Sequence, residues 1–327
     1  MTQFDDSHGL VEMVSHLKLK EDFPSCSRSS IHSLPKSHGP AAEGSAAGEG
    51  QYPYPAIKMA LWQDEKLCHF FSLMPAPNAT SRFSDRVENY VLYRPGYPPA
   101  ALQALRTECG LAPSHVVADI ASGTGIWTRM LLENGSAVFG VEPNAEMREA
   151  GERLLAGFPK FTSVAGTAEG TTLLDKSVDL VTTAQAAHWF DRERSRREFV
   201  RILKPGGWLV LLWNERVTDA TPFLRDYEQL LLTYGTDYKE VRHERTTSAV
   251  NEFFDPAPYQ ERAFETRQEF DYAGVEGRLL SSSYAPGPDH PQHGPMLREL
   301  RRIFDANAVS GRAAFEYKTR LYFGRLS

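Results

Sequence analysis

Residues 116–125 read VVADIASGTG, a short apolar run that leads into a turn of small residues. Runs of this kind form the buried strands of parallel sheets, and the residues that follow show a helical pattern. Gly123 and Gly125 lack a Cβ, so the backbone of the turn can approach a ligand closely. The helix that follows adds unpaired N–H groups. The pattern therefore predicts a strand, a tight turn and a helix that meet around a nucleotide-like ligand.

The chain beyond this turn alternates between apolar runs and helical patterns, which is typical of βαβ units around a parallel sheet. Two late alternating segments, Phe264–Tyr272 and Phe315–Phe323, predict two more strands, with a helix at Leu297–Phe304 between them. We expect an α/β fold with a seven-stranded mixed sheet and helices on both faces. The first five strands are predicted at about 115–120, 137–141, 161–165, 177–183 and 207–213, and helices at about 98–109, 125–134, 144–156 and 192–203.

The N-terminal part differs in composition from the rest. Its first 55 residues are rich in Ser, His, Gly, Pro and Ala and show no periodicity, so burial cannot offset the entropy of ordering them. We expect residues 1–75 to form a disordered or loosely docked extension and residues 76–327 to form the folded domain. The sequence leaves open whether residues 1–73 belong to the functional protein. A charged helical insertion at about 215–262 is a candidate lid.

The composition limits the classes of partner. The formal charge of -6 gives no basic surplus to neutralise phosphates, which disfavours nucleic acid and favours a small molecule. The three cysteines lack metal-ligand spacing, so we expect no metal site and no disulfide framework. No run reaches the ~18 apolar residues of a membrane helix. We expect a cytoplasmic protein that is a monomer or a weak homodimer.

Three residues around the glycine turn discriminate between nucleotide-like ligands. A nicotinamide-binding turn needs Gly or Ala three residues after its second glycine, where this chain has Thr128. Asp119 would repel a pyrophosphate but can help to hold the ammonium group of S-adenosylmethionine. Glu142, at the end of the second predicted strand, can accept hydrogen bonds from both hydroxyls of a ribose. Because dehydrogenases use the same device, Glu142 alone does not discriminate.

Further motifs appear in a fixed order along the chain. They are RFSDRVENY (82–90), YRPGYP (93–98), DIASGTG (119–125), VEPN (141–144), AQAAHWF (184–190) and LKPGG (203–207). With these motifs, the chain from Arg82 to its end resembles the class I S-adenosylmethionine-dependent methyltransferases, which have a Rossmann-like fold. Within them it is similar to the type-11 small-molecule group, which includes trans-aconitate methyltransferase-like enzymes.

The resemblance implies S-adenosyl-L-methionine as the cofactor and assigns its site. Residues that match Asp119, Gly123 and Gly125 line the methionine part in the family, and the residue that matches Glu142 holds the ribose. Asn144 and Met147 would approach the adenosine, and the loop after the third strand would approach the adenine. The full cofactor set is Asp119, Ala121, Gly123, Gly125, Glu142, Pro143, Asn144, Met147, Thr167, Ala168, Glu169 and Gln185.

Candidate acceptor-side residues each have two readings. His188, after the fourth strand, is either a general base or a residue that positions the acceptor. Trp189 either packs or forms an aromatic wall beside the sulfonium. Tyr90 and Tyr93 either fold over the cofactor or anchor their segment. Arg94 either clamps a carboxylate or forms a structural ion pair.

The predicted activity is in-line transfer of a methyl group to a small-molecule acceptor, whose identity and methylated atom the sequence does not determine. A noncatalytic binder of S-adenosylmethionine or S-adenosylhomocysteine is the main alternative. An open cavity on the sulfonium side would argue against it. A nicotinamide-dependent oxidoreductase is disfavoured by Thr128. The basic run Arg192–Arg201 contains interleaved acidic residues at helical spacing, so we interpret it as a solvated helix face.

Overall fold

A computed structural model describes residues 86–241 and 246–326 of the chain. All of them lie in the second of the two units into which the chain divides, Asp64–Ser327. The expected N-terminal extension and the first residues of the RFSDRVENY motif lie outside the described residues.

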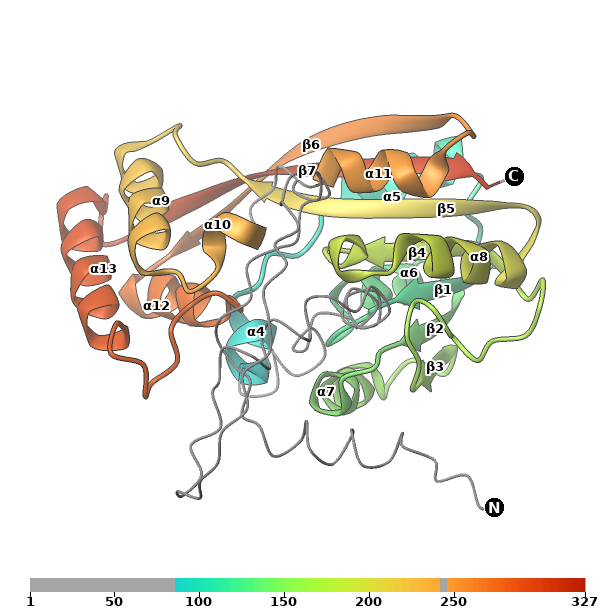
Figure 1. Cartoon of the computed structure of the whole chain (residues 1–327), viewed down its shortest axis with the longest axis horizontal. Coiled ribbons are helices and arrows are strands. Elements are labelled where there is room, and N and C mark those ends of the chain that lie inside the picture. The colour runs from blue at the N-terminus through green and yellow to red at the C-terminus, as the bar shows by residue number, and fades with distance from the viewer. Residues whose placement is uncertain (1–85, 242–245, 327) are drawn as a thin grey trace, which may run out of the picture. The chain divides into compact units, whose positions relative to one another are not determined.

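The strands form a seven-stranded sheet in the order β3-β2-β1-β4-β5-β7-β6 (Figure 1). Strands β1 to β5 are parallel, and β7 pairs antiparallel with β5. The last strand, β6, pairs antiparallel with β7. The predicted mixed sheet is confirmed. The strands are β1 (Val116–Ile120), β2 (Ala137–Val141), β3 (Phe161–Val164), β4 (Val178–Ala184), β5 (Leu203–Arg216), β6 (Tyr259–Phe270) and β7 (Ala313–Arg325).

Helices follow most strands, and polar side chains cap several of them. Asn144 accepts a hydrogen bond from the Met147 N–H, and Asp191 accepts one from the Arg194 N–H. Such caps satisfy N–H groups that have no partner within the helix. The helices are α4 (Val87–Tyr93), α5 (Pro99–Glu108), α6 (Ile126–Glu133), α7 (Ala145–Leu155), the 3₁₀ helix η1 (Ala187–Trp189), α8 (Arg192–Ile202), α9 (Pro222–Tyr234), α10 (Tyr238–Val241), α11 (Thr246–Phe254), α12 (Tyr272–Leu280) and α13 (His293–Asn307).

Alternate residues of the central strands enter two separate cores, as the pleat of a strand requires. Val117 and Leu180 pack with α5 and α6 on one face of the sheet. Ala118 and Val181 pack with α8 and α11 on the other face. Both faces are therefore covered, which explains why the central strands read as continuous apolar runs.

A third core lies beyond the parallel part of the sheet. Strands β5, β6 and β7 are long, and Figure 1 shows α9, α12 and α13 gathered at one end of them, away from β3. Phe315 and Tyr317 of β7 pack there against these helices. The long strands thus connect the glycine turn region with a helical layer.

The structure corrects several predicted boundaries. The insertion is shorter than the predicted 215–262, because β5 continues to Arg216 and β6 already begins at Tyr259. The segment predicted as a strand to Tyr272 ends at Phe270, where Asp271 caps a helix that we did not predict, α12. The residues of the LKPGG motif bulge out between the paired residues Leu203 and Trp208, with Gly206 at φ +77°.

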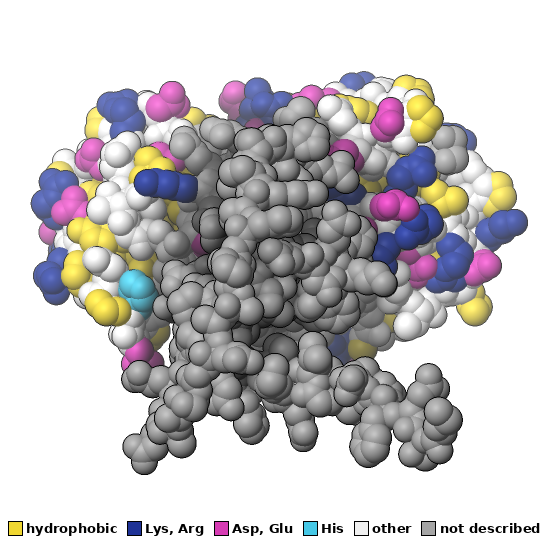
Figure 2. Space-filling model, in the orientation of Figure 1, with side chains coloured by type: hydrophobic (Ala, Val, Ile, Leu, Met, Phe, Trp, Pro, Cys, Tyr) yellow, Lys and Arg dark blue, Asp and Glu magenta, His cyan; other side chains and the backbone are white. Residues whose placement is uncertain are grey.

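Charged side chains are interspersed on the part of the surface that Figure 2 shows without grey atoms. On α8, Arg197 pairs with Glu193, and Arg192 pairs with Glu252 of α11. These pairs fit the interpretation of the basic run as a solvated helix face.

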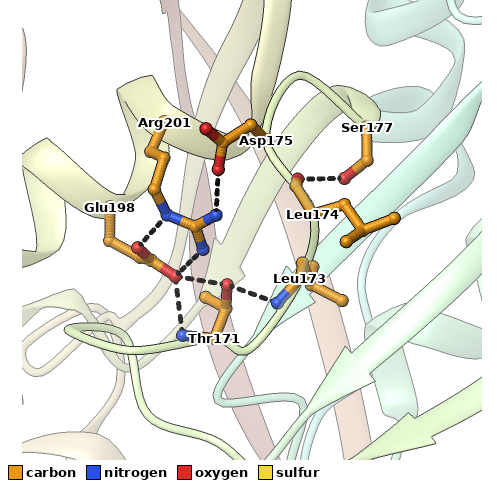
Figure 3. Close-up of polar contacts among 7 residues, drawn as sticks. All are labelled: Thr171, Leu173, Leu174, Asp175, Ser177, Glu198 and Arg201. Carbon is orange, nitrogen blue, oxygen red and sulfur yellow. Dashed lines mark hydrogen bonds and ion pairs between the residues drawn. The ribbon is translucent and has the colours of Figure 1, made fainter.

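One polar network ties α8 to the loop that precedes β4 (Figure 3). Glu198 accepts hydrogen bonds from both the N–H and the hydroxyl of Thr171, at 2.8 and 2.5 Å. Its other partner is Arg201, whose guanidinium also bonds Asp175. The Arg201 bonds hold the pKa of Glu198 at about 2 although its burial opposes this. The ionised network therefore fixes the loop on the helix.

Glu198→Gln should destabilise the protein by about 1–3 kcal/mol at pH 7, because it removes the charge from a hydrogen-bonded carboxylate. The lowered pKa of Glu198 stabilises the fold above the unfolded-state value of ~4.3. This contribution is lost as the pH falls toward about 2. The difference in unfolding free energy between wild type and variant, measured in urea, should therefore shrink at pH 3. Exposed Glu193→Gln is the control and should cost below about 1 kcal/mol. Equal stability of wild type and Glu198→Gln at pH 7 would contradict the role of the network.

Candidate functional site

A cavity of about 160 Å³ opens at the carboxyl ends of β1 and β4. The neighbours of these two strands continue in opposite directions across the sheet, so their connections diverge and leave a crevice. Ala121 and Ser122 line it after β1, and Gln185 and His188 line it after β4. This is the site where open α/β sheets bind ligands.

The glycine turn is held in place by Glu142. One carboxylate oxygen of Glu142 accepts a hydrogen bond from the Gly123 N–H at 2.8 Å, and the other accepts one from the Asn144 N–H at 2.9 Å. Burial raises the pKa of Glu142, and these two hydrogen bonds oppose the rise. Gly123 has φ +58°, and a Cβ added there would lie 3.4 Å from Met147 Cε. The turn and the end of β2 therefore form one unit.

Asp119 lies at the floor of the cavity and is 1% exposed. Its carboxylate accepts hydrogen bonds from the hydroxyls of Thr128, at 2.6 Å, and Thr182, at 3.2 Å. Burial raises the pKa of Asp119 to about 7, although these hydrogen bonds oppose the rise. Thr128, which excluded the nicotinamide pattern, thus has a direct structural task in supporting Asp119.

The end of β4 has an unusual backbone. Gln185 has φ +64°, and Ala121 at the end of β1 has φ +55°. Residues with a Cβ rarely adopt this region, and such strain is often found at functional sites. The Gln185 N–H bonds the Leu212 carbonyl, and its side-chain amide bonds the Asn214 carbonyl at 3.3 Å. The strained turn therefore directs η1, with His188 and Trp189, along the cavity wall.

The segment that precedes α5 covers the cavity from another side. Tyr90, Arg94 and Tyr97 line it. Arg94 donates to the Ser281 carbonyl at 2.8 Å, which attaches the segment to the end of α12. Tyr93 instead packs on Gly277 of α12, where an added Cβ would lie only 2.1 Å from its ring.

Only part of the predicted site borders the cavity. Asn144 caps α7, Ala168 is a core residue, and Glu169 accepts hydrogen bonds from the Asp191 N–H and the Ser195 hydroxyl. Tyr93 lies in the anchoring position, so the cavity gives no support for its binding role. The predicted residues on the lining are Tyr90, Arg94, Asp119, Ala121, Gln185, His188 and Trp189. Those outside it are Tyr93, Gly123, Gly125, Glu142, Pro143, Asn144, Met147, Thr167, Ala168 and Glu169.

Away from the glycine turn, the lining also contains residues that the sequence analysis missed. They come from the end of β5, from α10, from α12 and its following loop, and from β7. No motif marks them, because their meeting depends on the pairing of β5 with β7. They are Asn214, Arg216, Tyr238, Arg278, Ser283, Tyr284 and Tyr317.

The described part of the chain contains neither a candidate membrane span nor a candidate metal site. Within residues 86–241 and 246–326, no helix combines the length and apolar character that a bilayer span requires. The same ranges contain no group of three or more His, Cys, Asp or Glu side chains arranged to hold a metal ion.

Comparison with known proteins identifies the central part of the chain. Residues 118–211 match a family model described as a methyltransferase domain. An uncharacterized methyltransferase from Mycobacterium tuberculosis is 42% identical over 134 residues, which are 41% of this chain and 52% of that protein. An uncharacterized methyltransferase-like protein from Schizosaccharomyces pombe is 33% identical over 156 residues, 47% of this chain and 59% of that protein. The chain thus spans between half and three fifths of these relatives.

A solved structure extends the likeness in fold. A candidate type II methyltransferase from Anaeromyxobacter dehalogenans aligns with a TM-score of 0.55 at 22% identity. The alignment covers 71% of this chain and 98% of that one. At this identity the likeness concerns the fold alone.

Asp119→Asn should remove a pH dependence of stability that the Asp119 carboxyl group contributes. A carboxyl group with a folded-state pKa of about 7 binds a proton more tightly when folded than when unfolded. Wild-type stability therefore falls as the pH rises from ~4 to about 7. Asn cannot ionise, so the variant should gain about 2–3 kcal/mol relative to wild type between pH 5 and pH 8. Urea unfolding at both pH values measures this, with exposed Asp219→Asn as control. A pH-independent difference for Asp119→Asn would refute the assignment.

Gly277→Ala should weaken the attachment of α4. The new methyl group would overlap the Tyr93 ring, so α4 must shift, at a cost of about 1–3 kcal/mol. Gly294→Ala, in α13, is the control because its Cβ meets only the flexible end of Arg298 at 3.3 Å. Thermal unfolding should show a lower midpoint for Gly277→Ala and an unchanged or higher one for Gly294→Ala. The reverse order would contradict the packing.

Proposed function

We propose that the protein is a class I S-adenosylmethionine-dependent methyltransferase, which transfers a methyl group from S-adenosylmethionine to a small-molecule acceptor. The match of residues 118–211 to a methyltransferase-domain model supports this proposal. The observation that carries this proposal is the cavity, which borders both the glycine turn and the end of β4. A donor at the turn and an acceptor beside His188 would share one cavity. Such an arrangement favours displacement in line and excludes water.

The residues at the turn fit the donor. Buried polar atoms normally have partners. Two buried atoms on this part of the lining have none among the described residues: Thr124 Oγ1 and Trp127 Nε1. A polar ligand bound at the turn would supply their missing partners. When bound, S-adenosylmethionine would supply a methyl group on a positively charged sulfur that leaves readily.

The chain's own residues would hold and orient this group. Asp119 would face its ammonium end, and the proposed ribose contact is Glu142, which would have to share its oxygens with the Gly123 and Asn144 N–H groups. The loop with Thr167, Ala168 and Glu169 is the proposed adenine side. Met147 and Pro143 would complete the adenosine contacts. Gly123 permits this approach because its Cα carries no side chain.

On the acceptor side, we assign His188 and Trp189 to the wall that positions the acceptor. Their rings lie 4.7 Å apart, and both border the cavity. His188 would accept a proton only from an acceptor that must lose one, since displacement from a sulfonium needs no other acid or base. Tyr90 and Arg94 would cover the reacting groups and keep water out.

The competing functions have less support. A noncatalytic binder would need no space beyond the donor, whereas this cavity continues to Arg216 and Tyr317. A nicotinamide enzyme would bring a pyrophosphate to the turn, where Asp119 would repel it once ionised. The proposed acceptor is therefore a molecule small enough for the enclosed space past β4.

Calorimetric titration of the full chain tests the donor site. We expect binding of S-adenosylmethionine and S-adenosylhomocysteine but not of NADH. Gly123→Val places a branched side chain at φ +58° against Met147, and Glu142→Ala leaves the turn without its acceptor. Each variant should weaken binding by about tenfold or more, which corresponds to ~1.4 kcal/mol.

Two matched variants control for general damage. Gly157 has no atom within 4 Å of an added Cβ, and Glu149 is exposed on α7. Gly157→Val and Glu149→Ala should bind both sulfur ligands as the wild type does. Preference for NADH, or no binding of either sulfur ligand, would overturn the proposed function.

A further inference from the structure

Three arginines line the cavity, and two of them, Arg216 and Arg278, lie away from the glycine turn. Arg94 precedes α5, Arg216 ends β5 and Arg278 lies in α12. The Arg216 side chain is 7% exposed, and Arg278 is 6% exposed. Buried arginines at this exposure are rare unless a counter-ion or ligand accompanies them.

Little of this positive charge is neutralised by the described residues. Arg216 donates to Glu228 at 2.5 Å and to the Tyr238 hydroxyl at 3.0 Å. Arg278 donates to the Tyr317 and Ser282 hydroxyls, and Arg94 to a backbone carbonyl. Neither of these two forms an ion pair with a carboxylate in the described ranges. Among the described residues, two of the three guanidinium groups therefore have only neutral partners.

The electrostatic cost of this arrangement is visible at Arg94. Burial and then the charge of Arg278 lower the pKa of the Arg94 guanidinium. Asp119 is the only carboxylate among the described lining residues. It lies at the end of β1, where it accepts hydrogen bonds from two threonines. An uncompensated buried charge of this kind costs several kcal/mol, and proteins keep it where a ligand of opposite charge binds.

Free hydrogen-bonding capacity points to the same conclusion. The Arg216 Nη1 and Arg94 Nε atoms are buried and have no partner in the described part of the chain. Tyrosine residues surround the guanidinium groups, with Arg216 over the Tyr227 ring at 5.0 Å and Arg94 over the Tyr90 ring at 4.9 Å. The lining residues Tyr284 and Tyr317 add hydroxyl donors, whereas the Tyr238 hydroxyl already donates to Glu228. Guanidinium and phenol donors together match the oxygens of an organic acid.

The position of Arg216 places this charge on the acceptor side. Leu212 of β5 pairs with Ala184, the last residue of β4. Arg216 lies four residues farther along β5, which corresponds to ~13 Å of extended strand. The Arg278 side chain joins it through Tyr317, the β7 residue that pairs with Arg216. A donor over the turn after β1 leaves this end to the second substrate.

We propose that the methyl acceptor is a small organic anion, held by Arg216 and Arg278 with the tyrosine hydroxyls around them. This inference rests on the proposed function and adds the chemical class of the acceptor. Arg94 lies on the segment nearer the turn and could contact either the donor or the acceptor. The carboxylate of the donor is the other source of negative charge in the cavity, so the test must separate it from the acceptor.

The test uses ligand-observed NMR titrations of the full chain saturated with S-adenosylhomocysteine. The probes are succinate, glutarate and benzoate, each compared with its neutral amide, and inorganic phosphate. We expect at least one of the acids to bind and its amide not to bind. Arg216→Gln and Arg278→Gln should weaken the binding of that acid by about tenfold or more. Their affinity for S-adenosylhomocysteine should change by less than about threefold, since the donor lies elsewhere.

Two more variants separate charge from structure. Glu228→Gln removes the counter-ion of Arg216, so it should strengthen acid binding even if it lowers thermal stability. Arg267→Gln, on an exposed part of β6, is the control and should change the affinity for neither ligand. Opposite effects of Arg216→Gln and Glu228→Gln on acid affinity are the signature of a charge-driven site.

Three results would overturn the inference. They are equal binding of acids and amides, binding of phosphate alone, and parallel losses of acid and S-adenosylhomocysteine affinity in the Arg216 and Arg278 variants. The last would assign the arginines to the donor. Absence of S-adenosylhomocysteine binding in the wild type would instead refute the proposed function, so the two failures are distinguishable.

Discussion

The antiparallel pairing of β5 with β7 supports the walls of both halves of the cavity. The register runs from Trp208 opposite Arg325 to Arg216 opposite Tyr317, so one ladder extends well past the end of β4. Its near half closes the core beside β4, and its far half supports the layer of α9, α12 and α13. Without this extension, the crevice after β1 and β4 would open directly to solvent on the acceptor side.

The fold was predictable because its signals are local. An apolar strand, a glycine turn and a helix follow one another within 20 residues around Gly123, and the same pattern repeats along the chain. The limits of β5 and β6 were not predictable in this way. Polar residues such as Asn214 and Glu261 interrupt the apolar pattern, and their strands persist because the ladder with β7 supplies the hydrogen bonds. Tertiary pairing there overrides the sequence pattern.

The donor and acceptor sides of the candidate site also differ in how far local motifs indicate their residues. Asp119, Gln185 and His188 follow strand ends within recognisable motifs, so the sequence could indicate them. Arg216 and Arg278 are separated by a strand and several helices and belong to no motif, so only the folded chain brings them to one cavity. Thr128 lies between these two cases. Its place in the motif argues against a nicotinamide cofactor, but its hydrogen bond to Asp119 is evident only in the structure.

The cavity concentrates opposite charges at its two ends, and this separation has a cost. At one end, burial makes the ionised form of Asp119 unfavourable near neutral pH. At the other, buried guanidinium groups rest on tyrosine rings and neutral oxygens. Aromatic contacts return only part of the hydration that a guanidinium loses. A fold selected for stability alone would replace these groups with apolar residues. The retained charges are therefore best explained by ligands that bring the opposite sign, a cationic donor near Asp119 and an anionic acceptor near the arginines.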